Sequence, residues 1–166
     1  MLLRPAALLL ACALLPAPAD PTPPAAAFER LKALAGAWTG KGADGTTSHY
    51  AYEVVAGGSA LLERCEMPHD GVPVTMLTLF HLDGERLLLT HYCMAGNQPR
   101  MQAQAITEDS IAFEFVDATG LDTPDEGHMH RAVFRFDGPD RFTTEWTFRA
   151  GDKDVFTESE TCTRDR

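Results

Sequence analysis

Apolar and polar residues alternate along most of this chain, so that every second side chain shares a face. In 141–149, for example, Phe142, Thr144, Trp146 and Phe148 alternate with Thr143, Glu145, Thr147 and Arg149. This period of two is typical of a half-buried β-strand. It predicts ten strands, at 37–42, 47–56, 59–67, 73–81, 85–94, 100–106, 110–116, 128–137, 141–149 and 153–162. Short turns rich in Gly and Asp separate many of them, as in β-hairpins.

One segment ahead of the strands has a helical period instead. Phe28, Leu31, Leu34 and Ala35 lie on one face of a helix over 28–34. Ten strands joined by tight turns form an antiparallel meander, which exposes edges unless it closes. The predicted fold is therefore all-β, a roughly ten-stranded antiparallel up-and-down barrel with a short N-terminal helix plugging one end.

The first residues have the pattern of a secretory signal peptide over 1–19. Arg4 precedes an apolar run that is too short to cross a bilayer, and Ala17-Pro18-Ala19 fits a cleavage site. Residues 20–27 are predicted to be a disordered tether and 28–166 a single barrel domain, periplasmic or secreted. Alternatively, Leu9-Leu10-Ala11-Cys12 resembles a lipobox, which would anchor the protein through Cys12. No other segment has about 18 consecutive apolar residues, so we expect no transmembrane segment.

Charge and cysteine content narrow the possible partners. The chain has 14 Lys and Arg against 24 Asp and Glu, which argues against nucleic acid or anionic lipid as a partner. Cys65, Cys93 and Cys162 remain after the predicted cleavage. Their odd number allows one disulfide and a free thiol, or three small buried side chains.

Two motifs resemble known families. Gly36, Trp38, Gly40 and Gly42 form a G-x-W-x-G-x-G pattern, which resembles the opening strand of calycin-type (lipocalin-like) barrels, particularly the nitrobindin-like proteins. The resemblance implies that the Trp plugs the barrel floor beneath a short helix. Residues 90–101 and 128–130 resemble an uncharacterised family of small exported bacterial proteins. Nitrobindin-like proteins bind haem through a His near the C-terminal strand, whereas the last His here is His130, so haem is disfavoured.

The strongest candidates for a site are histidines that share a strand face. His128 and His130 have the parity of Phe134 and Phe136, and the polar partners on the other face include Arg131 and Arg135. We therefore expect both histidines to point into the barrel. His91 and Cys93 have the same spacing, so these four side chains are candidate ligands for Zn or Cu. Alternatively, these side chains form hydrogen bonds to each other, to water, or to Tyr92 and Asn97.

These observations favour a small-molecule-binding barrel with a mostly apolar ligand. The predicted contacts are His91, Arg100, Phe113, His128, His130, Phe134, Phe136 and Trp146. One alternative is an enzyme that uses His128 or His130 as acid–base or metal ligand in the pocket. Another is a packed, ligand-free barrel that acts through a partner surface. The ligand, any reaction and the oligomeric state are left open by the sequence.

Overall fold

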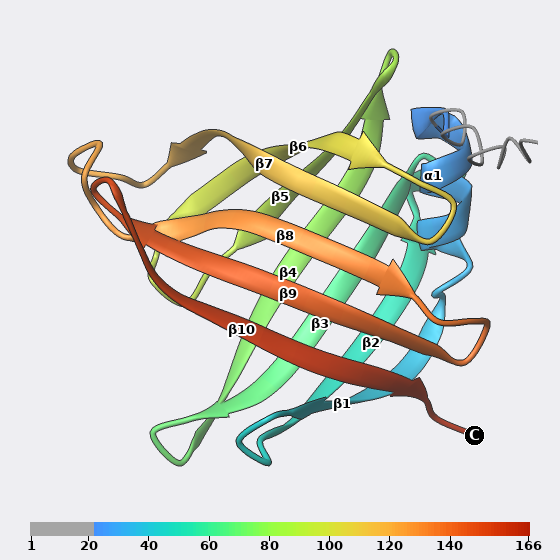
Figure 1. The fold of residues 1–166 in the computed structure, drawn as a ribbon, viewed down its shortest axis with the longest axis horizontal. Helices are drawn as coiled ribbons and strands as arrows, with labels where there is room; N and C mark the ends of the chain where they lie inside the picture. Colours follow the sequence, from blue (N-terminus) through green and yellow to red (C-terminus); the bar gives the residue numbers. More distant parts are fainter. Residues whose placement is uncertain (1–21) are drawn as a thin grey trace, which may run out of the picture.

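The computed structural model describes residues 22–166 and shows a closed antiparallel barrel of ten strands with one short helix at an end (Figure 1). The elements are α1 (Pro24–Lys32), β1 (Gly36–Gly42), β2 (Thr47–Val55), β3 (Ala60–His69), β4 (Val72–Asp83), β5 (Arg86–Tyr92), β6 (Gln98–Ile106), β7 (Ser110–Thr119), β8 (His128–Phe136), β9 (Arg141–Ala150) and β10 (Lys153–Arg164). Each strand pairs with its neighbours in sequence, and β1 pairs with β10 to close the ring. The predicted fold class is confirmed. No helix within residues 22–166 is both long enough and apolar enough to span a membrane.

Helix α1 seals one end of the barrel with its apolar face. Ala27, Phe28 and Leu31 are buried there. The helix begins at Pro24, inside the segment that the sequence suggested would be a disordered tether. Proline is favoured in the first helical turn because that turn does not need its N–H, and the alanines that follow are strong helix formers. The tether assignment of 24–27 is therefore corrected.

Trp38 and Arg164 connect the end of the helix to the barrel floor through hydrogen bonds and a cation–π contact. The Trp38 indole Nε1 donates to the Leu34 carbonyl at 2.7 Å. The Arg164 guanidinium lies 4.2 Å from the centre of the Trp38 ring and donates to the carbonyls of Ala33 and Ala35, both at 2.9 Å. These carbonyls lie just beyond the helix end, where backbone acceptors otherwise lack partners. The Trp38 side chain thus fills the floor beneath the helix.

Four phenylalanines fill the half of the barrel nearest α1. Phe80, Phe113, Phe134 and Phe142 are fully buried. The Phe80 ring meets those of Phe113 and Phe134 edge to face, with centroids 5.9 and 5.6 Å apart. Such aromatic packing leaves this half solid. Any internal site must lie in the other half, towards the loops that join β3 to β4, β5 to β6, β7 to β8 and β9 to β10.

Strand β8 contains a bulge that changes which residues face inward. The β8–β9 register shifts between Met129 and Arg131, so His130 is an extra residue on its strand. A bulge reverses the alternation across it. Met129 therefore shares the inner face with Ala132 and Phe134, which differs from the uninterrupted parity expected from the sequence.

Candidate functional site

The half of the barrel remote from α1 contains an internal cavity of about 40 Å³. It is bounded by side chains from several strands: Tyr50, Glu63, Cys65, Met67, Met76, His91, Met129, Thr144, Trp146, Glu158 and Glu160. Strand β3 supplies Glu63, Cys65 and Met67 because residues two apart share a face. The lining combines three methionines and Trp146 with three acids, Glu63, Glu158 and Glu160.

A second hollow of about 220 Å³ continues from this cavity to the barrel mouth. The two share Met67, Met76, Met129 and Glu158 as walls. The outer hollow is completed by His69, Cys93, Met94, Ala95, Phe148 and Phe156. Methionine is unbranched and flexible, so the three shared methionines form an adaptable partition between mouth and cavity. A small apolar molecule that moves from the mouth to the inner cavity must pass these three side chains.

A chain of buried hydrogen bonds reaches the cavity at His91. The Tyr52 hydroxyl donates to Glu63 Oε2 at 2.6 Å. Thr78 Oγ1 donates to Glu63 Oε1 at 2.9 Å and lies 3.0 Å from His91 Nδ1. All four side chains are at most 4 % exposed. The other ring nitrogen of His91, Nε2, is buried and has no hydrogen-bond partner among the residues that the structure describes.

Burial shifts the pKa of both Glu63 and His91 in this chain. Loss of hydration raises the pKa of the Glu63 carboxyl to about 7, although its bonds from Tyr52 and Thr78 act in the opposite direction. Burial lowers the pKa of His91 to about 4. The His91 ring is therefore neutral at physiological pH, and the cavity presents a neutral imidazole rather than a cation.

A second acid lies on the opposite wall. Glu160 on β10 accepts a hydrogen bond from Ser48 Oγ at 2.7 Å and another from the Tyr50 hydroxyl. Gly40 on β1 makes this arrangement possible, because a Cβ there would come within 2.8 Å of both the Glu160 carboxylate and the Tyr50 ring. Gly40, which belongs to the opening motif, thus leaves space in the interior for the Glu160 and Tyr50 side chains.

Two polar atoms in the cavity wall have no partner within residues 22–166. These are His91 Nε2 and Thr144 Oγ1, both fully shielded from solvent. Trp146 lies against the His91 ring, with centroids 4.8 Å apart. Each unsatisfied buried polar group costs about 1–3 kcal/mol. The wall can therefore gain a hydrogen bond from a molecule that enters.

The structure brings only two of the sequence-predicted contact residues, His91 and Trp146, to this cavity. Phe113 and Phe134 fill the solid half near α1. Phe136 lies farther down, with the Arg30 guanidinium 5.2 Å from its ring centre. Arg100 pairs with Asp117, its Nε 2.8 Å from Oδ1, and both side chains are half exposed. Arg100 is thus placed on the barrel surface instead of in the cavity.

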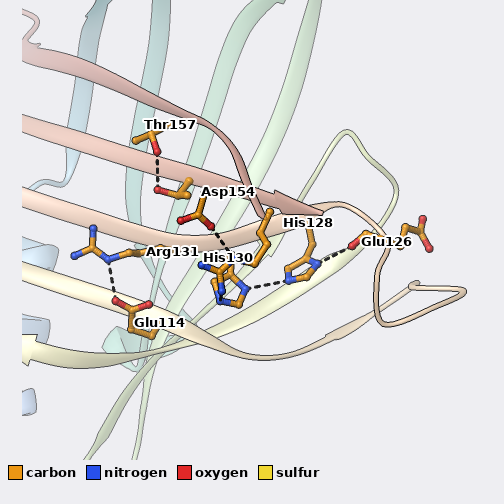
Figure 2. Close-up of polar contacts among 9 residues, drawn as sticks. Glu114, Glu126, His128, His130, Arg131, Asp154 and Thr157 are labelled. Atoms are coloured by element: carbon orange, nitrogen blue, oxygen red, sulfur yellow. Dashed lines mark hydrogen bonds and ion pairs between the residues drawn. The ribbon is translucent and has the colours of Figure 1, made fainter. Parts of the chain in front are cut away.

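His128 and His130 form a separate cluster where the β7–β8 ladder ends (Figure 2). His128 Nδ1 lies 2.8 Å from the Glu126 carbonyl, and its Nε2 lies 3.1 Å from His130 Nδ1. His130 Nε2 is 2.8 Å from Arg149 Nη1. The His130 ring stacks on Phe115, and the His128 ring packs against Phe115 at a tilt. Neither histidine lines the cavity, because the β8 bulge gives that place to Met129. The alternative in which the histidines bond to each other describes this cluster in part, because their other partners are the Glu126 carbonyl and Arg149 instead of Tyr92 or Asn97.

The four candidate metal ligands His91, Cys93, His128 and His130 do not form one group. Within residues 22–166, no three His, Cys, Asp or Glu side chains converge on a point where they could hold an ion. Cys65, Cys93 and Cys162 are free thiols, and burial raises the pKa of all three. They behave as small apolar side chains, which is one of the two possibilities that the sequence left open.

Sequence reasoning missed the polar residues of the cavity, above all Glu63, Thr78 and Glu160. A signal existed for the first of them. Glu63 shares its parity with Leu61, Cys65 and Met67, whereas the opposite face carries Arg64 and Glu66. An acid on the apolar face of a strand is unusual unless it is bonded or used. Its partners on other strands depend on the register of the barrel, which parity alone does not give.

Comparison with known proteins identifies the fold without a family. No family model and no curated protein matches the chain. Among solved structures, Rv2717c from M. tuberculosis is similar with a TM-score of 0.60 and 20% sequence identity, over 89% of this chain and 100% of that chain. This likeness supports the barrel architecture.

Two further solved barrels are less similar. The redesigned beta barrel b11L5F_LGL gives a TM-score of 0.42 at 10% identity, over 82% of this chain and 94% of its own. EF1p2_mFAP2b bound to DFHBI gives 0.41 at 10% identity, over 80% and 94% of the two chains.

Proposed function

We propose that this chain is an exported calycin-like barrel that binds a small, mostly apolar molecule in its hollow half. The apolar body of the ligand lies among Met67, Met76 and Met129, and its polar end reaches His91. A cavity at a barrel mouth with a few convergent polar groups is typical of small-ligand sites.

One observation carries the proposal. His91 Nε2 and Thr144 Oγ1 are buried in the wall of the same cavity without partners among the described residues. Folding leaves such atoms unpaired at a cost, which a site recovers when a ligand bonds to them. The hydrogen bond with Thr78 holds His91 in place before any ligand arrives, and this preorganisation favours binding.

The calycin resemblance and the signal-peptide pattern support the rest of the proposal. The Gly36-x-Trp38 motif lies at the barrel floor beneath α1, as that resemblance implies. The predicted signal peptide and Cys12 lie outside the residues that the structure describes. Export places the barrel in the periplasm or outside the cell.

Binding is testable with the neutral fluorescent probe N-phenyl-1-naphthylamine. We expect its emission to rise and shift to the blue in a saturable, one-to-one titration. Met129→Trp places a bulky side chain between mouth and cavity, so the affinity should fall by at least about tenfold, equivalent to about 1.4 kcal/mol. Met76→Phe is a milder block at the same partition and should also weaken binding.

The matched control is Val155→Trp, which adds a tryptophan at a side chain that is 59% exposed and lines neither hollow. It should bind the probe like the wild type. Circular dichroism of each variant checks that the barrel is folded. The packed, ligand-free alternative would be favoured if the wild type showed no saturable signal, or if both blocking variants bound as well as it did.

Export is testable by mass spectrometry of the protein purified from its own host. We expect a mature chain that begins at Asp20, because Ala17-Pro18-Ala19 fits the cleavage pattern. A chain that begins at an acylated Cys12 would replace this with the lipoprotein alternative.

A further inference from the structure

Thr78 lies between an acid and a histidine and has only one hydrogen to give. Glu63 Oε2 already accepts the Tyr52 hydroxyl, and its Oε1 lies 2.9 Å from Thr78 Oγ1. Above its pKa of about 7, Glu63 is an ionised carboxylate, which only accepts hydrogen bonds. Thr78 therefore donates to Glu63, and its oxygen is left to accept a hydrogen bond from His91 Nδ1, 3.0 Å away.

This fixes the tautomer of His91. A neutral imidazole carries one proton, so a proton on Nδ1 leaves a bare lone pair on Nε2. That nitrogen is the atom of the cavity wall that lacks a partner among the described residues. The cavity therefore presents a hydrogen-bond acceptor at the point where a ligand would make its main polar contact.

The charge of the cavity wall further restricts the chemical class of ligand that can bind. Glu63, Glu158 and Glu160 line the cavity, and no Lys or Arg within residues 22–166 does. A carboxylate ligand would meet acids and a lone pair with no cation of this wall to pair with it. The Thr144 hydroxyl either donates or accepts, so it does not distinguish one ligand class from another.

We infer that Glu63 and Thr78 are positioning residues that make His91 Nε2 a hydrogen-bond acceptor. The barrel therefore selects apolar ligands that end in a hydrogen-bond donor, such as an alcohol or an amine, and rejects carboxylates. This inference rests on the proposed function, since it names the ligand class of the same cavity. Glu63 and Thr78 act through His91 and need not touch the ligand.

The tautomer is measured directly by NMR of protein labelled with ¹⁵N-histidine at pH 8. Glu63 is ionised there because its pKa is about 7. We expect a protonated Nδ1 and an unprotonated Nε2 for His91, with the resonance assigned by its loss in His91→Gln. A protonated Nε2 in the wild type would overturn the inference, whatever the probe titration shows.

Glu63→Gln should invert the pattern. The Tyr52 hydroxyl still needs an acceptor and keeps the amide oxygen, so the amide NH₂ turns to Thr78 and donates to it. Thr78 then donates to His91 Nδ1, and the proton moves to Nε2. An unchanged tautomer in this variant would contradict the mechanism.

A second pair of variants keeps the test independent of how well the Glu63→Gln substitution is tolerated. Thr78→Val removes the hydroxyl at nearly constant size and should release His91 from its fixed tautomer. Thr78→Ser keeps the hydroxyl and should preserve the wild-type pattern. If the Val and Ser variants behaved alike, Thr78 would have a packing role only.

Ligand selectivity is read by displacing N-phenyl-1-naphthylamine with four probes that share one apolar ring. We expect cyclohexanol and cyclohexylamine to displace it, cyclohexanone to be roughly tenfold weaker because His91 stays unpaired, and cyclohexanecarboxylate to fail. In Glu63→Gln, where Nε2 donates, cyclohexanone should bind about as tightly as cyclohexanol, because the hydroxyl of the alcohol can also accept. Equal affinities for all four compounds in the wild type would contradict the inference about ligand class but not the proposed function. Failure of the fluorescent probe itself to bind would contradict the proposed function.

Discussion

Replacing Phe134 with Ala should lower the free energy of unfolding by about 3–5 kcal/mol, the usual cost of deleting a large core side chain. Phe134 is fully buried and its ring packs against four aromatic neighbours: Phe80, Phe113, Phe142 and Trp146. Three of these neighbours, Phe80, Phe113 and Phe142, are fully buried in close packing themselves, so they can move little into the vacated space.

Urea unfolding followed by circular dichroism measures this loss. Val155→Ala is the control, since Val155 is 59% exposed and its truncation should change stability by less than about 0.5 kcal/mol. A Phe134→Ala loss below about 1 kcal/mol would mean that the half of the barrel near α1 is not packed solid.

Glu63→Gln and His91→Gln should change the pH dependence of stability in opposite directions. The pKa of Glu63 is about 7 in the folded protein and ordinarily 4.5, so the folded state binds the extra proton between these values. Stability from this group is therefore greatest below pH 4.5 and falls as the pH rises to 7. Relative to Glu63→Gln, the wild type should lose about 3 kcal/mol across that window.

The contribution of His91 to stability changes with pH in the opposite direction. Its pKa is about 4 in the folded protein and ordinarily 6.5, so the unfolded state binds the extra proton in between. Stability from this group is present above pH 6.5 and falls as the pH drops to 4. Relative to His91→Gln, the wild type should lose about 3 kcal/mol over that fall.

Urea titrations at several pH values between 4 and 7.5 compare the two variants, each serving as the control for the other. In the wild type the two effects oppose each other between pH 4.5 and 6.5, where the windows overlap. Difference curves with the same sign for both variants would show that the Glu63–Thr78–His91 chain is not buried as described.

The fold could be predicted from the sequence because the strand periodicity, the turn residues and the cost of exposed sheet edges all indicate the same architecture. Period-two alternation located all ten strands, and turn residues such as Gly84 and Gly151, both with positive φ, marked hairpins. Closure followed from the cost of exposed edges. The helix start was misplaced because 24–27 contain Pro and Ala without large apolar residues, so the helical period was visible only from Phe28.

The site was only partly readable, and the β8 bulge explains much of the error. A prediction from parity assumes unbroken alternation of inward and outward side chains. The sequence His128-Met129-His130-Arg131 contains no feature that indicates an extra residue in the strand. The prediction therefore put two histidines on the wall where Met129 lies. Trp146 was found from parity because its own strand contains no such interruption near it, whereas His91 was named from its spacing with Cys93 and not from parity. The acids were missed because a buried Glu is intelligible only through partners on other strands.

The most direct test of the central claim is a titration of protein labelled with ¹³C at the methionine methyl groups. Met67, Met76 and Met129 line the cavity and its mouth, whereas Met101 is fully buried and lines neither hollow. With N-phenyl-1-naphthylamine added stepwise, we expect the first three methyl resonances to shift together along one saturable isotherm while that of Met101 stays in place. If the three remained unmoved while the probe bound, or if Met101 shifted with them, the hollow half around His91 would not be the binding site.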